Sequence, residues 1–284
     1  MQTRLFTRAT AGAALAVVAA HDDLVVAGTA RGQLVLIRDL GGSAPGSAVS
    51  SANREAAPIT LRASRGPLDL CATAGRIWVH TGSALLMLGA PDQPLTTRRE
   101  RGVIAIAACG PLMALVQSEA GAELARLRGD DEAWQSTPLP EAARRLVEGA
   151  GEDDTADAPQ ADRLRFTAAA GGRLAAIAAG GSVAVSRDGG VSFELVALDA
   201  NDGIAAITFA GDEADAPLLV LAAKVGGSEA AIVRVRAGGA ATRVASVLGV
   251  APDRPAAIAW DAAREVVWVA CAGGLLAFGK TPRH

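Results

Sequence analysis

The sequence of 284 residues contains no tyrosine, three histidines, three cysteines and very few lysines. Its formal net charge is -3, so it lacks the basic excess of nucleic-acid-binding proteins, and we expect no nucleic-acid partner. Cys71, Cys109 and Cys271 have no metal-type spacing and the histidines are scattered, so we expect no metal site and no cofactor. An odd number of unpatterned cysteines is typical of reduced thiols and favours a cytoplasmic location.

Long apolar runs are also missing. No run reaches the roughly 18 apolar residues that a membrane-spanning helix needs, so we expect no membrane insertion. Residues 1–23 contain two arginines followed by an Ala/Val run, which is the outline of an export signal. Because the same run also fits the first strand of the repeat described next, a periplasmic or secreted location is the alternative.

A pattern of three short apolar strands joined by tight turns occurs six times along the chain. The copies begin near residues 15, 69, 103, 165, 204 and 256. The mean step is about 48 residues, close to the length of a four-stranded propeller blade. Weaker fourth strands follow five of the copies, with the sequences "PITLRAS", "PLTTRRE", "WQSTPLP", "SFELVAL" and "ATRVASV".

The repeat predicts an all-β fold, a six-bladed β-propeller with four-stranded blades, as a single domain over residues 1–284. The sixth copy has no fourth strand, so we expect residues 2–9 to join the C-terminal blade and close the ring. Residues 141–162 are expected to form a flexible excursion between blades, with one or two helical turns at its start. The expected blades are residues 13–64, 65–101, 102–140, 163–199, 203–248 and 254–280.

One segment carries a specific motif. The sequence "SRDGGVSF" at residues 186–193 matches S-x-D-x-G-x-[ST]-[WF]. An aspartate accepts hydrogen bonds from backbone N–H groups ahead of it, and glycine adopts positive φ without a steric clash. These residue types therefore predict a tight turn in preference to a ligand site. The matching residues are Ser186, Asp188, Gly190, Ser192 and Phe193.

On these residues the chain resembles the Asp-box (BNR-repeat) β-propellers, a group that includes sialidases, glycosidases and non-enzymatic assembly factors. The resemblance implies that residues 186–193 form the hairpin between the third and fourth strands of a blade, with a mainly structural role. A sialidase site needs a tyrosine nucleophile, which this chain lacks, so the resemblance is to a non-sialidase member. Only one copy of the repeat carries the full motif.

Other catalytic patterns have simpler explanations. Many acidic residues fall in turns, such as Asp212, Glu213 and Asp215, which favours solvated turns over a pair of glycosidase carboxylates. Residues 274–281 have the spacing of a phosphate loop, but only three residues follow Thr281, where such a loop requires a helix. We therefore predict that the chain is not an enzyme and has no catalytic residues.

The remaining expectation is a rigid disc that presents loops to protein partners. Its composition, rich in Ala, Gly and Arg, is typical of a GC-rich genome, and we expect a scaffold subunit of a bacterial multi-protein assembly. Small propellers of this sort accompany AAA+ ATPases and other assembly machines, so an AAA+ ATPase is one candidate partner. The candidate partner surface consists of two basic clusters, Arg98, Arg99 and Arg101 in one and Arg144 and Arg145 in the other.

The alternative comes from another functional class, a degenerate glycan-active or glycan-binding Asp-box propeller that is exported from the cytoplasm. A functional export signal, or two carboxylates within about 10 Å of each other in a central pocket, would favour this alternative. Their absence would favour the scaffold.

Overall fold

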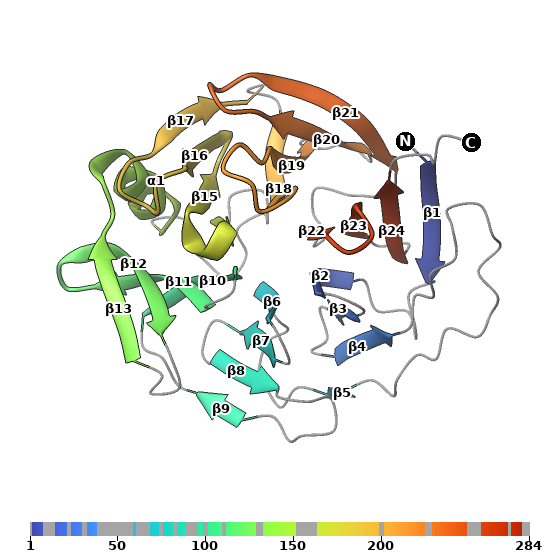
Figure 1. Ribbon diagram of the computed structural model, residues 1–284, viewed down its shortest axis with the longest axis horizontal. Helices are drawn as coiled ribbons and strands as arrows, with labels where there is room; N and C mark the ends of the chain where they lie inside the picture. The colour runs from blue at the N-terminus through green and yellow to red at the C-terminus, as the bar shows by residue number, and fades with distance from the viewer. Residues whose placement is uncertain are drawn as a thin grey trace.

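The computed structural model of the chain is shown in Figure 1. It describes residues 2–7, 15–21, 24–29, 33–38, 59–60, 69–73, 76–81, 85–88, 96–98, 102–109, 112–128, 133–151, 164–198, 202–224, 229–248, 257–271 and 274–279.

The described residues form six four-stranded sheets, and all paired strands are antiparallel. We number the sheets I to VI in chain order. Sheet I contains β2 (Leu15–His21), β3 (Leu24–Thr29), β4 (Gln33–Arg38) and β5 (Ile59–Thr60). Sheet II contains β6 (Asp69–Thr73), β7 (Arg76–His80), β8 (Leu85–Leu88) and β9 (Thr96–Arg98). Sheet III contains β10 (Val103–Ala108), β11 (Leu112–Ser118), β12 (Gly121–Arg128) and β13 (Ala133–Pro138).

The second half of the chain repeats this arrangement. Sheet IV contains β14 (Arg165–Ala169), β15 (Leu174–Ala179), β16 (Ser182–Ser186) and β17 (Glu194–Ala197). Sheet V contains β18 (Asp202–Phe209), β19 (Leu218–Lys224), β20 (Glu229–Val235) and β21 (Ala241–Leu248). Sheet VI contains β22 (Ala257–Asp261), β23 (Val266–Cys271), β24 (Gly274–Gly279) and, beside β24, the N-terminal strand β1 (Gln2–Thr7). The prediction of an all-β fold is confirmed.

The sheets lie around a common centre, with the first strand of each copy innermost (Figure 1). Each of these strands contacts the first strand of the next sheet, and β22 contacts β2. Small apolar residues suit this position because strands from six sheets converge there. The innermost strand of sheet III, β10, consists entirely of such residues, with the sequence VIAIAA.

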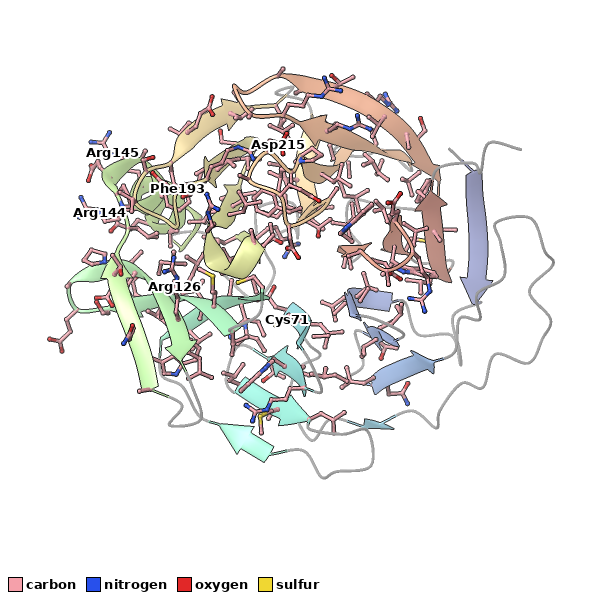
Figure 2. The ribbon with its side chains drawn as sticks, viewed as in Figure 1. Cys71, Arg126, Arg144, Arg145, Phe193 and Asp215 are labelled. Atoms are coloured by element: carbon pink, nitrogen blue, oxygen red, sulfur yellow. The ribbon has the colours of Figure 1, made fainter. Side chains whose placement is uncertain are left out.

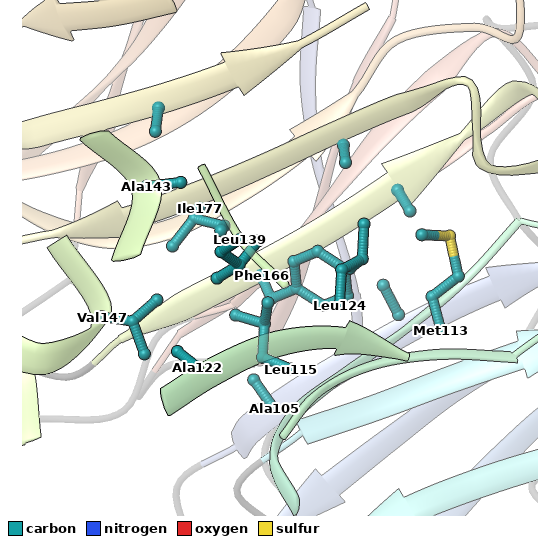
Figure 3. Close-up of a cluster of buried hydrophobic side chains, with 14 residues drawn as sticks. Ala105, Met113, Leu115, Ala122, Leu124, Leu139, Ala143, Val147, Phe166 and Ile177 are labelled. Atoms are coloured by element: carbon teal, nitrogen blue, oxygen red, sulfur yellow. The ribbon is translucent and has the colours of Figure 1, made fainter. Parts of the chain in front are cut away.

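The hydrophobic core consists of separate clusters between neighbouring sheets. The cluster between sheets III and IV, which we call the III–IV cluster, includes Met113, Leu115 and Leu124 on one side and Phe166 and Ile177 on the other (Figure 3). Burial of side chains of this size contributes about 1.5–3 kcal/mol each to folding. Each sheet is therefore stabilised mainly through contacts with its two neighbours.

Of the segment 141–162, expected to be a flexible excursion with one or two helical turns at its start, the structure describes residues 141–151. They form α1 (Glu141–Gly151), an 11-residue helix that packs on β12, β15 and β16. Ala143 and Val147 are one helical turn apart, and both are buried in the III–IV cluster. Through these two apolar residues, about three turns of helix pack against the sheets, where one or two helical turns had been expected. Residues 152–163 lie outside the described part of the chain.

No helix in the described part of the chain is long and apolar enough to cross a membrane.

Candidate interaction surface

Residues 186–193 form a closed hydrogen-bond network in the hairpin between β16 and β17. The Asp188 carboxylate accepts hydrogen bonds from the Ser192 backbone N–H at 2.9 Å and from the Ser192 hydroxyl at 2.5 Å. Ser186 Oγ donates to Asp188 at 2.8 Å and accepts from the Gly190 N–H at 2.8 Å. The polar groups of the motif are thus bonded to one another within the turn.

The same bonds favour the ionised form of Asp188. The hydroxyl and then the backbone N–H of Ser192 stabilise the carboxylate and lower its pKa from the usual 3.8 to about 2. The side chain is exposed to solvent, but its oxygens accept hydrogen bonds from Ser186 and Ser192 within the turn. Asp188 is therefore ionised at neutral pH and has the role of a turn residue.

Glycine at position 190 is required by backbone conformation and by close packing. Gly190 has φ of +87°, and a Cβ atom there would lie 2.6 Å from Leu124 Cδ2. Leu124 belongs to β12, so the hairpin of sheet IV is in direct contact with sheet III.

Arg126 joins the hairpin to sheet III. Its Nη2 group donates to the carbonyl oxygen of Gly189 at 2.6 Å and to that of Gly172 at 3.2 Å. Gly172 belongs to a short 3-10 turn (Ala170–Gly172) between β14 and β15. The two turns are also bonded directly, since the Gly189 N–H donates to the Arg173 carbonyl at 2.8 Å.

On the other side, the hairpin is joined to sheet V. Arg187 donates to the carbonyl oxygens of Ala214 and Ala216, at 3.0 and 3.1 Å, in the loop between β18 and β19. Asp212 of the same loop accepts a hydrogen bond from the Ala170 N–H at 2.9 Å. Loops at one end of sheets IV and V, together with β12, are thus linked by side-chain-to-backbone bonds.

The aromatic residue of the motif lies on the sheet III side. Phe193 is partly buried against the III–IV cluster. The two residues at i±2 from it, Val191 and Leu195, are the large apolar side chains with the highest exposure in the described part of the chain, 76% and 55%. An apolar strip therefore extends from the core to the surface along the hairpin and β17.

Of the two basic clusters, the structure describes the side chains of Arg144 and Arg145 only. Arg98 is the last residue of β9 in sheet II, and α1 lies next to sheets III and IV in Figure 1. The Arg98 side chain and residues Arg99 and Arg101 lie outside the described part of the chain. On α1, Arg144 forms an ion pair with Glu141, and Arg145 Nε lies 2.6 Å from Glu141 Oε1 (Figure 2). Hydrogen bonds from Arg145 and then Arg144 lower the pKa of Glu141. The positive charge of this second cluster is therefore partly neutralised within the helix.

Other reactive groups have structural surroundings. Burial raises the pKa of Cys71 well above its ordinary value and that of Cys109 to about 12, so both thiols stay protonated. No group of three His, Cys, Asp or Glu side chains suited to a metal occurs among the described residues. The glycines of the phosphate-loop pattern, Gly274 and Gly279, are the ends of β24, a strand paired on both sides. Lys280 and Thr281 lie outside the described residues.

Comparison with solved structures supplies the fold type. The β-propeller domain of Cps50 (Swd1) from Myceliophteria thermophila is similar over 94% of this chain and 84% of its own, with a TM-score of 0.52 and 8% identity. The fold is that of a β-propeller.

A second similar structure is the extracellular domain of BT4673 from B. thetaiotaomicron, described as a one-component system. The similarity covers 98% of the present chain, with a TM-score of 0.51 and 11% identity. It covers only 40% of the BT4673 chain, which is longer. Another structure of the BT4673 domain gives a TM-score of 0.51 and 11% identity, over 97% of this chain and 39% of that one. No family model and no curated protein matches the sequence.

Proposed function

We propose that the chain is a six-bladed β-propeller whose blades are sheets I to VI and whose ring is closed by β1. Two observations support this proposal. The innermost strands contact one another in sequence, including β22 with β2, and β1 pairs with β24 from Gln2 opposite Gly279 to Thr7 opposite Leu275. We further propose that residues 186–193 are an Asp-box hairpin, because Ser186, Asp188 and Ser192 form a closed network in the turn.

Within that fold we propose a non-enzymatic scaffold, a protein-interaction subunit of a bacterial, cytoplasmic assembly. The observation that carries it is the set of bonds by which Arg126 and Arg187 link the Asp-box hairpin to both neighbouring sheets. Loops fixed in this way lose little conformational entropy when a partner binds, which favours recognition by a preformed surface. The polar groups of the motif, in contrast, are already bonded within the turn.

The proposal is tested by purifying the chain from its host with chemical cross-linking and identifying bound proteins by mass spectrometry. We expect a partner in constant ratio to the chain, and a co-purified AAA+ ATPase would agree with the partner class considered above. The purified chain is assayed in parallel against a panel of chromogenic glycosides. Hydrolysis that disappears on substitution of an acidic residue would contradict the scaffold proposal and favour the glycan-active alternative.

A further inference from the structure

Strand pairing shows which side chains of sheet III point toward sheet IV. Leu115 pairs with Leu124, and Leu124 pairs with Thr137 on the outermost strand, β13. Directly paired residues of an antiparallel ladder lie on the same face of a sheet. Both leucines belong to the III–IV cluster, so Thr137 also faces sheet IV, and it is exposed.

Sheet IV shows the corresponding arrangement from the other side. Ile177 pairs with Ala184, and Ala184 pairs with Leu195 on the outermost strand, β17. Ile177 and Ala184 belong to the same cluster, so Leu195 faces sheet III, although 55% of it is exposed. The facing sides of the two outer strands therefore remain accessible at Thr137 and Leu195.

Helix α1 occupies one part of this border between the sheets. Its contacts are with β12 of sheet III and with β15 and β16 of sheet IV, and its buried residues are Ala143 and Val147. The element that covers this border within the chain is thus an amphipathic helix with small and branched apolar residues at i and i+4. Phe193 packs against the same cluster from the β16–β17 hairpin, and the exposed Val191 and Leu195 lie two residues before and after it.

A cation lies at the same border. Arg126 pairs with Met113, a member of the III–IV cluster, and therefore also faces sheet IV. It is partly buried, and within the described chain its guanidinium bonds to two backbone carbonyl oxygens and to no carboxylate. A guanidinium has five N–H donors, so donors remain for an acidic group. Figure 2 labels Arg126 and Phe193 on this side of the ring.

We propose that this outer III–IV surface, formed by Arg126, Thr137, Val191, Phe193 and Leu195, binds an amphipathic helix of a partner protein. The partner helix places apolar side chains at i and i+4 on Val191, Phe193 and Leu195 and an Asp or Glu against Arg126. A helix already packs on these two sheets within the chain itself, since Ala143 and Val147 of α1 are buried in the III–IV cluster. The inference rests on the proposed function and specifies the binding surface and the chemistry of the partner.

A phage-displayed library of helix-forming peptides, about 18 residues or five turns long, provides the probe. Peptides are selected on the intact chain, synthesised, and measured by fluorescence anisotropy, with circular dichroism to report helix formation on binding. We expect selected peptides to share apolar residues at i and i+4 together with an Asp or Glu. Leu195→Glu should weaken their binding at least ten-fold without a change in melting temperature, because this side chain is already largely exposed.

Thr242→Glu is the matched control, since Thr242 is also exposed on an outermost strand, β21, but in sheet V. This variant should bind the peptides as the unmodified chain does. Replacing the shared acidic residue of a peptide with Lys should weaken binding to the unmodified chain and much less to the Arg126→Gln variant.

Three results would overturn the inference: no selected helical peptide, peptides that bind as extended strands, or binding that Leu195→Glu leaves unchanged. Self-association abolished by Leu195→Glu in sedimentation would replace the partner helix with a second copy of the chain. In each case the scaffold proposal stands or falls separately, on the cross-linking and glycoside assays.

Discussion

Arg126 on β12 donates a hydrogen bond of 2.6 Å to the carbonyl oxygen of Gly189, a residue 63 positions later in the chain. The bond crosses from sheet III to the hairpin of sheet IV, and the same guanidinium also holds Gly172. One side chain on a regular strand thus fixes two turns of the neighbouring sheet. The rigidity of the surface at the border between sheets III and IV therefore depends on Arg126.

Arg126→Ala should lower the free energy of unfolding by about 1–3 kcal/mol, because it leaves two carbonyl oxygens without their donor. Urea denaturation followed by tryptophan fluorescence measures the change. The matched control is Arg173→Ala, an exposed arginine nearby, which should change stability by less than about 0.5 kcal/mol. Equal effects of the two substitutions would show that the guanidinium bonds contribute little.

Asp188→Ala should destabilise the chain by about 0.5–1.5 kcal/mol, since the Ser192 N–H and hydroxyl lose their acceptor but are exposed to water. Asp188→Asn keeps one acceptor oxygen and should be less harmful. Both are measured by urea denaturation. Peptide or partner binding should persist in both variants, and binding lost from a variant of normal stability would assign Asp188 to the interface.

The low pKa of Asp188 also predicts a pH dependence. Its pKa is about 2 in the folded chain against an ordinary value of 3.8, so the unfolded chain takes up the proton first as pH falls. The stabilisation by this carboxylate is complete above about pH 5 and decreases as pH falls from 4 to 2. The difference in urea midpoint between the unmodified chain and Asp188→Asn should therefore narrow over that window, and a difference that widens would contradict the assignment.

The sequence predicted the first three strands of each sheet well because most are short apolar runs that end at a Gly or polar turn, whereas the outermost strands, such as β13 (AWQSTP), are more polar. It also predicted the turn at residues 186–193, since all the bonds of Asp188 are made within four residues. The roles of Arg126 and Arg187 could not be read from sequence, because their acceptors lie on other sheets. For α1, the spacing of Ala143 and Val147 was a usable signal that a longer helix packs there.

Val147→Ala in α1 should lower the free energy of unfolding by about 1–3 kcal/mol, because this side chain is buried in the III–IV cluster. On the same helix, a Cβ at Gly149 would have no atom within 4 Å, so Gly149→Ala should raise stability by about 0.5–1 kcal/mol. Thermal and urea denaturation measure both. If Gly149→Ala gives no gain, the last turn of α1 contributes little to folding.

The proposed closure of the ring by β1 predicts that a small deletion has a large effect. β1 pairs with β24 over most of its length, and in β24 both Leu275 and Phe278 are almost fully buried. Removal of residues 1–9 should expose the edge of β24 and weaken the contact between the first and last sheets, which promotes both unfolding and edge-to-edge association. The melting temperature should fall by several degrees, at about 2–4 °C for each kcal/mol lost in a chain of this size.

A synthetic peptide of residues 1–9 added to the truncated chain provides the specific control. It should restore the melting temperature in a concentration-dependent manner, because a strand that binds only the folded state stabilises it by mass action. A peptide of the same composition in scrambled order should have no effect, since the register from Gln2 opposite Gly279 to Leu5 opposite Leu276 would be lost. A truncated chain that melts like the intact one would show that β1 does not hold the ring closed.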